Sequence, residues 1–307
     1  MPILGSFGAG SGRGYGQRGG FFGPRCITYD FFVVGGGGGA TNGYGGGGGG
    51  GGVHYSYGAP GTCGVTLNTD CGPISVQIGA GGSANNGPGG GTTPYPAGDG
   101  GTSIVFKCTP LAITVKGGGG ADTRHKNGRA APNPLGGSGG GGGCFHHCNP
   151  TSGGAGSCYG TPGSGSPNYS GPSCARFRSG SGGGRCTAAT NGGGGGNGAA
   201  GCGKASDIDG TTKNYGCGGV GSGVTDTAGR GCGGGCGHQA IANQGGGGGS
   251  NQPGCNAGVG ADGVVYLRFP SACKPACLAV TPGCNSILVA GGCTVLKFVV
   301  SGCVTFT

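Results

Sequence analysis

Large apolar side chains and charged side chains are both scarce in this chain of 307 residues. It has no tryptophan, one methionine, 17 basic and 8 acidic residues. Charged residues make up 8% of the chain, against about 25% in an average domain, and leucine, isoleucine, valine and phenylalanine are too few to fill an interior of this size. We therefore expect something other than side-chain packing to hold most of the chain together.

Long apolar stretches are also missing. No window approaches the ~18 consecutive apolar residues of a membrane span. The opening segment MPILGSFGAGSGRGYGQRGG has neither the apolar core nor the cleavage site of a signal peptide. We therefore expect neither membrane insertion nor export by the usual route.

What the chain has instead is glycine, 93 residues of it, arranged in blocks. Collagen needs glycine at every third position, so this arrangement excludes it. A flexible linker is disfavoured because β-like segments and cysteines interrupt the blocks, while disorder stays open as an alternative. The main blocks are residues 35–39, 45–52, 117–120, 139–143, 192–196 and 245–249.

The blocks favour polyglycine II, a threefold extended helix that rises ~3.1 Å per residue without internal hydrogen bonds. Its amides must find partners in neighbouring helices. Helices without side chains approach closely enough for N–H···O=C bonds and weak Cα–H···O contacts between them. We therefore predict a bundle of such helices in place of a hydrophobic core.

Runs of β-branched and aromatic residues bounded by glycine or proline predict short strands, and no stretch shows a helical period. The predicted fold class is mainly β and irregular, with short β-strands flanking a glycine-rich region of bundled polyglycine II helices and essentially no α-helix. Almost nothing strand-like is expected between residues 117 and 260. The predicted strands are 26–34, 53–57, 74–78, 102–107, 111–115, 263–269, 286–290, 294–300 and 304–307.

The same pattern divides the chain into four parts. Residues 1–25 form an N-terminal Gly/Arg attachment segment, and residues 26–116 a strand-rich part with the first glycine blocks. Residues 117–262 form the polyglycine II region, and residues 263–307 a C-terminal β-strand tail.

Ordering glycine costs about 0.5 to 1 kcal/mol per residue beyond alanine in regular structure, so we expect covalent staples. The 19 cysteines are the candidates, because a disulfide stabilises a fold by ~2 to 4 kcal/mol. Their number is odd, so at least one thiol is free or pairs between chains; alternatively, the thiols stay reduced as small apolar side chains. The disulfide candidates are Cys63, Cys71, Cys144, Cys148, Cys232, Cys236, Cys273, Cys277, Cys284, Cys293 and Cys303.

Two clusters, CFHHC and CGGGCGH, contain soft ligands of the kind that bind zinc. A disulfide-rich chain explains these cysteines without a metal, so zinc is the weaker hypothesis. The weak metal candidates are Cys144, His146, His147, Cys148, Cys232, Cys236 and His238.

No convincing catalytic or cofactor site appears. The stretch GAAGCGKA nearly matches a phosphate-binding loop, but Lys204 is followed by Ala205 instead of Ser or Thr, and the flanks lack the required strand and helix. Asp207 and Asp209 form the closest acidic pair, as turn residues or a weak calcium site. Without an acid, base and nucleophile constellation we expect no enzyme and no cofactor.

The formal net charge is +9, which favours attraction to acidic polymers. The basic residues do not interleave with aromatic side chains as nucleic-acid stacking platforms do. Surface polymers such as lipopolysaccharide or acidic glycans are therefore expected ahead of nucleic acid. The candidate contacts are Arg124, Lys126, Arg129, Arg176, Arg178 and Arg185.

The ordered succession of blocks and strands resembles a known family. It runs FFVVGGGGGATNGYGGGGGGGG, PISVQIGAGG, GGTSIVF, ITVKGGGGA and GADGVVYLRFP. From about Cys26 to Pro270 the chain resembles the glycine-rich domain of bacteriophage tail fibres and related virion proteins, and it departs from that family in its cysteine content. The resemblance implies a non-enzymatic structural or host-recognition protein with bundled polyglycine II helices.

We therefore expect a virion structural protein on the virion surface: a tail fibre, tip adhesin or surface fibre that forms a rigid disulfide-stabilised scaffold and contacts the host. The expected partners are further copies of the chain, with a trimer favoured, other virion proteins, and a host glycan or lipopolysaccharide. The alternative is a non-viral extracellular structural, filament or ice-binding protein built from the same glycine helices, located in a matrix or filament.

Overall fold

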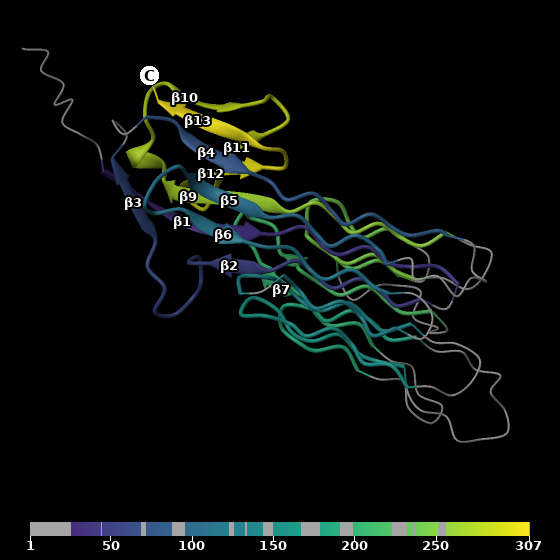
Figure 1. Ribbon diagram of the computed structural model, residues 1–307. Helices are drawn as coiled ribbons and strands as arrows, with labels where there is room; N and C mark the ends of the chain where they lie inside the picture. Colours follow the sequence, from purple (N-terminus) through teal and green to yellow (C-terminus); the bar gives the residue numbers. More distant parts are fainter. Residues whose placement is uncertain are drawn as a thin grey trace, which may run out of the picture.

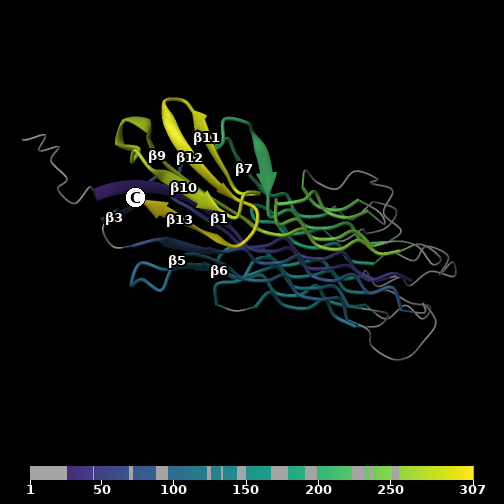
Figure 2. The same ribbon diagram turned by 90° about the horizontal axis from the view of Figure 1, so that it is seen from above.

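A β-sandwich and an array of extended glycine segments make up the computed structural model (Figure 1). The array projects from one end of the sandwich, as the turned view in Figure 2 also shows. Among the described residues the only helical element is the 3₁₀ turn η2 (Ser271–Cys273). No helix in this part of the chain is long and apolar enough to cross a membrane. The structure describes residues 26–43, 45–68, 72–87, 96–122, 126–132, 134–143, 150–166, 179–190, 199–222, 232–235, 238–250 and 256–306.

Two antiparallel sheets form the sandwich. The first has the order β11 (Ser286–Ala290), β12 (Cys293–Phe298), β9 (Val264–Pro270), β1 (Cys26–Val34) and β2 (Val53–Tyr55), with β3 (Val65–Asn68) paired to the first half of β1. The second has the order β10 (Leu278–Thr281), β13 (Gly302–Phe306), β4 (Ile74–Gln77), β5 (Ser103–Lys107) and β6 (Ile113–Val115). A separate hairpin consists of β7 (Lys204–Ser206) and β8 (Lys213–Tyr215).

The sandwich core lies between the two sheets. Side chains alternate along β1, so Phe31 and Val33 enter this core while Phe32 and Val34 face the other side of the first sheet. The β7–β8 hairpin covers that other side by burying Ile208 and Tyr215 against Phe32. The first sheet is thus buried on both faces near its middle.

The strand predictions are confirmed with the same bounds at residues 26–34 and 286–290, and with shorter or shifted bounds elsewhere. The structure adds β3, β10, β7 and β8, and the last two contradict the expectation of almost no strands between residues 117 and 260. Their sequences, KAS and KNY, carry little β signal. They pair because the hairpin buries Tyr215 on the first sheet, which is a tertiary contact.

Beyond β1 the chain continues as a threefold extended helix. Backbone amides three residues apart in residues 35–40 donate to the same neighbour, which is the repeat of polyglycine II. The three accepting neighbours are segments 45–52, 96–101 and 256–261. The bonds run from Gly35 and Gly38 to Gly52 and Gly49, from Gly36 and Gly39 to Gly101 and Gly98, and from Gly37 and Ala40 to Ala261 and Gly258.

The carbonyl groups of the same helix accept from three further segments. Residues 116–121, 79–85 and 245–248 supply these donors, so the helix has six neighbours, all bonded through backbone groups. Segment 45–52 is surrounded in the same way. The predicted bundle of polyglycine II helices is confirmed, and we call it the glycine lattice.

The lattice also joins the continuations of the two sheets directly. Stacked sheets lie about 10 Å apart because side chains fill the space between them. Past the sandwich, however, Gly36 after β1 donates to the carbonyl of Gly101 before β5 at 3.0 Å. Once the side chains are absent, the two layers close onto each other and hydrogen bonds replace the apolar core.

Glycine is required inside the lattice by the close approach of backbones. A Cβ atom on Gly48 would lie 2.1 Å from the carbonyl oxygen of Gly38. On outer helices one residue in three points to solvent, and these positions carry side chains. The exposed residues are Ala80, Ser83 and Asn86 on one helix and Asn256, Val259 and Asp262 on the next.

Serine is tolerated inside the lattice where its hydroxyl replaces a backbone partner. The buried Ser179 donates from Oγ to the carbonyl of Gly45 at 2.6 Å, and the amide of Ser222 donates to the same Oγ at 2.7 Å. The buried Ser181 Oγ likewise accepts from the amide of Gly221. These hydroxyls satisfy backbone groups that would otherwise be buried without a partner.

We predict that Gly48→Ala destabilises the protein by about 1 to 3 kcal/mol, because overpacking forces neighbouring backbone to shift. The matched control is Gly283→Ala, since a Cβ there meets nothing within 4 Å. Chemical denaturation measures both. Equal unfolding free energies for the two variants would contradict a close-packed lattice.

Candidate functional site

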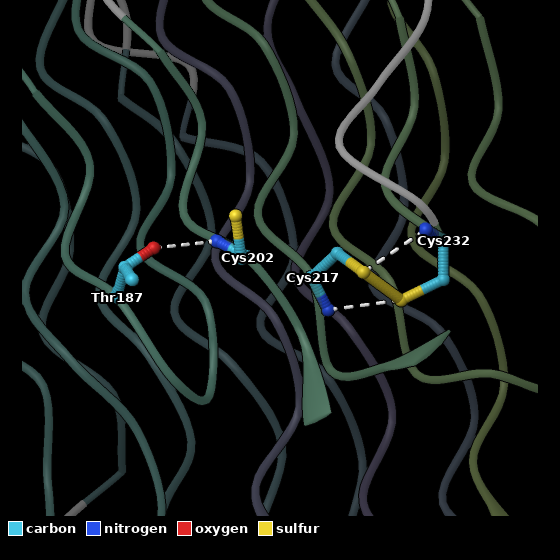
Figure 3. The surroundings of a disulfide bond; sticks show 4 residues. All are labelled: Thr187, Cys202, Cys217 and Cys232. Atoms are coloured by element: carbon cyan, nitrogen blue, oxygen red, sulfur yellow. Dashed lines mark hydrogen bonds between the residues drawn. A yellow bond between two sulfur atoms is a disulfide. The ribbon is translucent and has the colours of Figure 1, made fainter. Parts of the chain in front are cut away.

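One disulfide lies inside the glycine lattice. Cys217 and Cys232 are both buried and are bonded with their Cα atoms 5.4 Å apart. Each backbone amide donates to the sulfur of the other residue, at 3.1 and 2.9 Å (Figure 3). The bond therefore ties two lattice segments together at a point where both amides donate to sulfur.

The predicted disulfide candidates lie in several places. Cys232 forms a disulfide, as predicted for a candidate. Its partner Cys217 was not among the candidates, because nothing in the surrounding glycines distinguishes it from the other cysteines of the chain. Cys71, Cys144, Cys148 and Cys236 lie outside the described residues. Cys63, Cys273 and Cys284 are exposed and Cys293 and Cys303 are half-buried, and none of these five forms a disulfide in the described part of the chain. Cys277 is also exposed.

The zinc hypothesis loses one ligand to the disulfide. Cys232 is bonded to Cys217 and is therefore not available as a thiolate. His238 lies in the lattice, where its backbone amide donates to the carbonyl of Gly235. The remaining candidates Cys144, His146, His147, Cys148 and Cys236 lie outside the described residues, and no group of metal-ligating side chains gathers in the part that is described.

The acidic pair lies in the turn of the β7–β8 hairpin. The carbonyl of Asp207 accepts from the amide of Gly210, and the buried carboxylate of Asp209 pairs with Lys213. Burial alone would raise the pKa of Asp209, but the hydrogen bond and charge of Lys213 outweigh it and lower that pKa. Asp209 also accepts from the hydroxyl of Tyr266 at 3.3 Å, so both aspartates act as turn and packing residues.

Two buried tyrosines complete this polar cluster, which the sequence did not indicate. The hydroxyl groups of Tyr215 and Tyr266 are hydrogen-bonded at 3.1 Å. Burial raises the pKa of Tyr215 to about 12, with the nearby Asp209 charge adding to the effect and the hydrogen bond to Tyr266 opposing it. These phenols therefore stay neutral and fix the hairpin on the sheet.

Lys204, from the near-match to a phosphate-binding loop, begins strand β7. A phosphate-binding lysine would begin a helix. Here its ammonium group lies over the ring of Tyr55, 4.9 Å from the centroid, which is a cation–π contact.

Two of the basic residues predicted to contact acidic polymers instead form contacts within the protein. Arg129 forms an ion pair with Asp99 at 2.8 Å and donates to the carbonyl of Ala97 at 3.1 Å. Arg185 donates from Nε to the carbonyl of Val53 at 3.1 Å. Lys126 is exposed, and Arg124, Arg176 and Arg178 lie outside the described residues.

Arg185 belongs to a junction between the sandwich and the lattice. The ring of His54 on β2 stacks on Tyr159 at 4.7 Å between centroids and meets Phe31 edge-on. Burial lowers the pKa of His54, and the nearby Arg185 charge lowers it further. The junction is therefore built around a neutral imidazole.

The end of the lattice far from the sandwich gathers the ends of several segments (Figure 1). Thr41 donates from Oγ1 to the carbonyl of Asp122 at 3.1 Å, and Ser250 donates from Oγ to the carbonyl of Thr41 at 2.5 Å. Segments 35–41, 116–122 and 245–250 thus end side by side. We call this the distal end, and it is the candidate contact surface.

The fold and this geometry define a β-sandwich protein that carries a glycine lattice. The family model of the glycine-rich domain matches residues 21–270, which is most of the chain, so the chain belongs to that family. No curated protein and no solved structure matches it.

We predict that Cys232→Ser lowers the unfolding free energy by about 3 kcal/mol, because the bond spans 15 residues. Cys63→Ser, at an exposed position, is the control and should unfold like the parent protein. Denaturant titrations with and without a reductant make the measurement. If the parent protein loses no stability on reduction, the disulfide does not stabilise the lattice.

We predict that stability falls as the pH drops from about 7.5 to 5.5. The folded state lowers the pKa of His54, so the unfolded chain binds the proton first, near pH 6.5. His54→Phe should flatten this part of the curve, whereas His238→Gln, at an exposed histidine, should not. Identical slopes for the parent protein and His54→Phe would refute the assignment.

Proposed function

We propose that the chain is a virion structural protein: a tail fibre, tip adhesin or surface fibre. In this role the sandwich and lattice form a rigid scaffold, and the distal end contacts the host surface. The partners would be further copies of the chain, with a trimer favoured, other virion proteins, and a host glycan or lipopolysaccharide. The location would be the virion surface.

The observation that carries this proposal is the glycine lattice. Segments 35–40 and 45–52 are each hydrogen-bonded to six others, so bending one of them would break bonds to several neighbours. Such an array suits a structure that must keep its shape while it presents the distal ends of its segments far from the sandwich. The order of strands and glycine blocks, which resembles tail-fibre domains, supports the same role.

The geometry of the distal end adds support. Backbone and hydroxyl hydrogen bonds hold the segment ends around Thr41, Asp122 and Ser250 at fixed positions. Recognition residues are commonly carried on loops that a rigid scaffold positions. The exposed Lys126 follows Asp122 by four residues in the sequence and would attract an acidic surface polymer.

A non-viral extracellular role is the second candidate, because the same lattice would serve a filament. Ice binding would need a flat row of repeated Thr or Ala side chains. Two of the outward rows instead consist of Ala80, Ser83 and Asn86, and of Asn256, Val259 and Asp262. Since the side chains do not repeat, we place the virion role first.

Immunogold electron microscopy tests the proposal. Antibodies raised against the full chain should label virus particles from the producing culture, at the tail or surface, and pre-immune serum should not. Label confined to a cell-wall or matrix fraction, with the particles bare, would overturn the virion role in favour of the extracellular one.

A further inference from the structure

At the surface of the glycine lattice, unlike in its interior, some backbone donors and acceptors have no neighbouring helix to bond to. An outer polyglycine helix keeps donors and acceptors that point away from its neighbours every third residue, about 9.3 Å apart. A second copy of this chain carries the same repeat and would supply matching partners. The lattice edge is thus comparable to the exposed edge of a β-sheet, which joins other chains unless it is protected.

At four points on this surface, an Asp or Asn side-chain oxygen accepts from an amide of the adjacent helix. The Oδ1 atom of Asp262 accepts from Gly81 at 2.7 Å, and that of Asn86 accepts from Ala257 at 2.6 Å. These two residues lie on adjacent helices, 256–262 and 79–86, so each helix supplies the acceptor for the other. The side chains occupy donors that would otherwise be open to a neighbouring chain.

The other two lie on helices 96–101 and 126–131. Asp99 accepts from Gly120 at 2.8 Å, and Asn127 accepts from Ser152 at 2.8 Å. Arg129 pairs with Asp99 and in addition donates to the carbonyl of Ala97. This pair therefore closes one lattice donor and one lattice acceptor together.

All four side chains do the same chemistry on different helices. Each is an Asp or Asn whose oxygen reaches an amide of the adjacent helix, where the interior of the lattice would use a backbone carbonyl. Side chains of this kind need solvent-facing space, and the outer positions of the threefold repeat provide it. All four side chains thus accept a lattice hydrogen bond at a place where, among the described segments, no further glycine helix follows.

We propose that Asp99, Asp262, Asn86 and Asn127 close the edges of the glycine lattice against pairing with a second copy of the chain. Without these side chains, the amides of Gly81, Gly120, Ser152 and Ala257 become donors for another lattice. Copies then associate through glycine helices, beyond any oligomer that the protein forms by other contacts. This inference does not depend on a virion role.

Asp262 allows a matched test. Asp262→Ala removes the acceptor for the amide of Gly81, while Asp262→Asn keeps an oxygen acceptor and removes only the charge. Sedimentation velocity of the full chain over a concentration series is the measurement. We expect Asp262→Ala to shift to multiples of the native mass with rising concentration, and Asp262→Asn to keep the native mass.

Two further variants separate the proposal from a simple charge effect or a failure to fold. Asp207→Ala removes a carboxylate from the hairpin turn, outside the lattice surface, and should keep the native mass. Asn127→Ala should associate and Asn127→Asp should not. The proposal is overturned if Asp262→Ala and Asn127→Ala keep the native mass, if the Asn and Asp replacements associate equally, or if circular dichroism shows that the associating variants are unfolded.

Discussion

The close approach of glycine backbones is the contact on which the rest of the structure depends. Segments 35–40 and 45–52 each bond to six neighbours, and a Cβ atom on Gly48 would fall 2.1 Å from a carbonyl oxygen. Ordering so much glycine is entropically unfavourable. The lattice offsets this because nearly every interior residue gains backbone hydrogen bonds, each worth about 0.5 to 1.5 kcal/mol net, together with weaker Cα–H···O contacts.

The sandwich gives the lattice its register. The pairing of Val34 with Val53 and Val264 places the glycines that follow or precede them in bonding position. These lattice segments therefore begin side by side at the edge of the sandwich. Apolar packing in the sandwich aligns glycine helices that have few side chains of their own with which to select a neighbour.

Polar side chains act where backbone bonding stops. Buried serines such as Ser179 replace a backbone partner inside the lattice, and the Cys217–Cys232 bond joins segments whose amides meet sulfur instead of carbonyl oxygen. At the distal end Thr41 and Ser250 hold segment ends together. The residues that resembled ligands or catalytic groups in the sequence, such as Asp209 and Lys204, are used in the same structural way.

The sequence by itself determined which kinds of secondary structure this protein contains. The glycine blocks exclude collagen and allow a polyglycine II bundle, and the β-branched run from Cys26 to Val34 marks the first strand with its observed bounds. Both follow from local chemistry, namely the absence of a Cβ atom and the pattern of apolar residues.

Only the tertiary structure decided which segments meet. Strands β7 and β8 pair because Tyr215 is buried against Phe32, and Cys232 bonds to Cys217 because the lattice places them 5.4 Å apart. The tertiary structure also places Arg129 where it forms an ion pair with Asp99 and a hydrogen bond to the carbonyl of Ala97. A glycine block has no side chain to specify its neighbour, so its partners are fixed by the strands and turns at its ends, and these contacts are long-range.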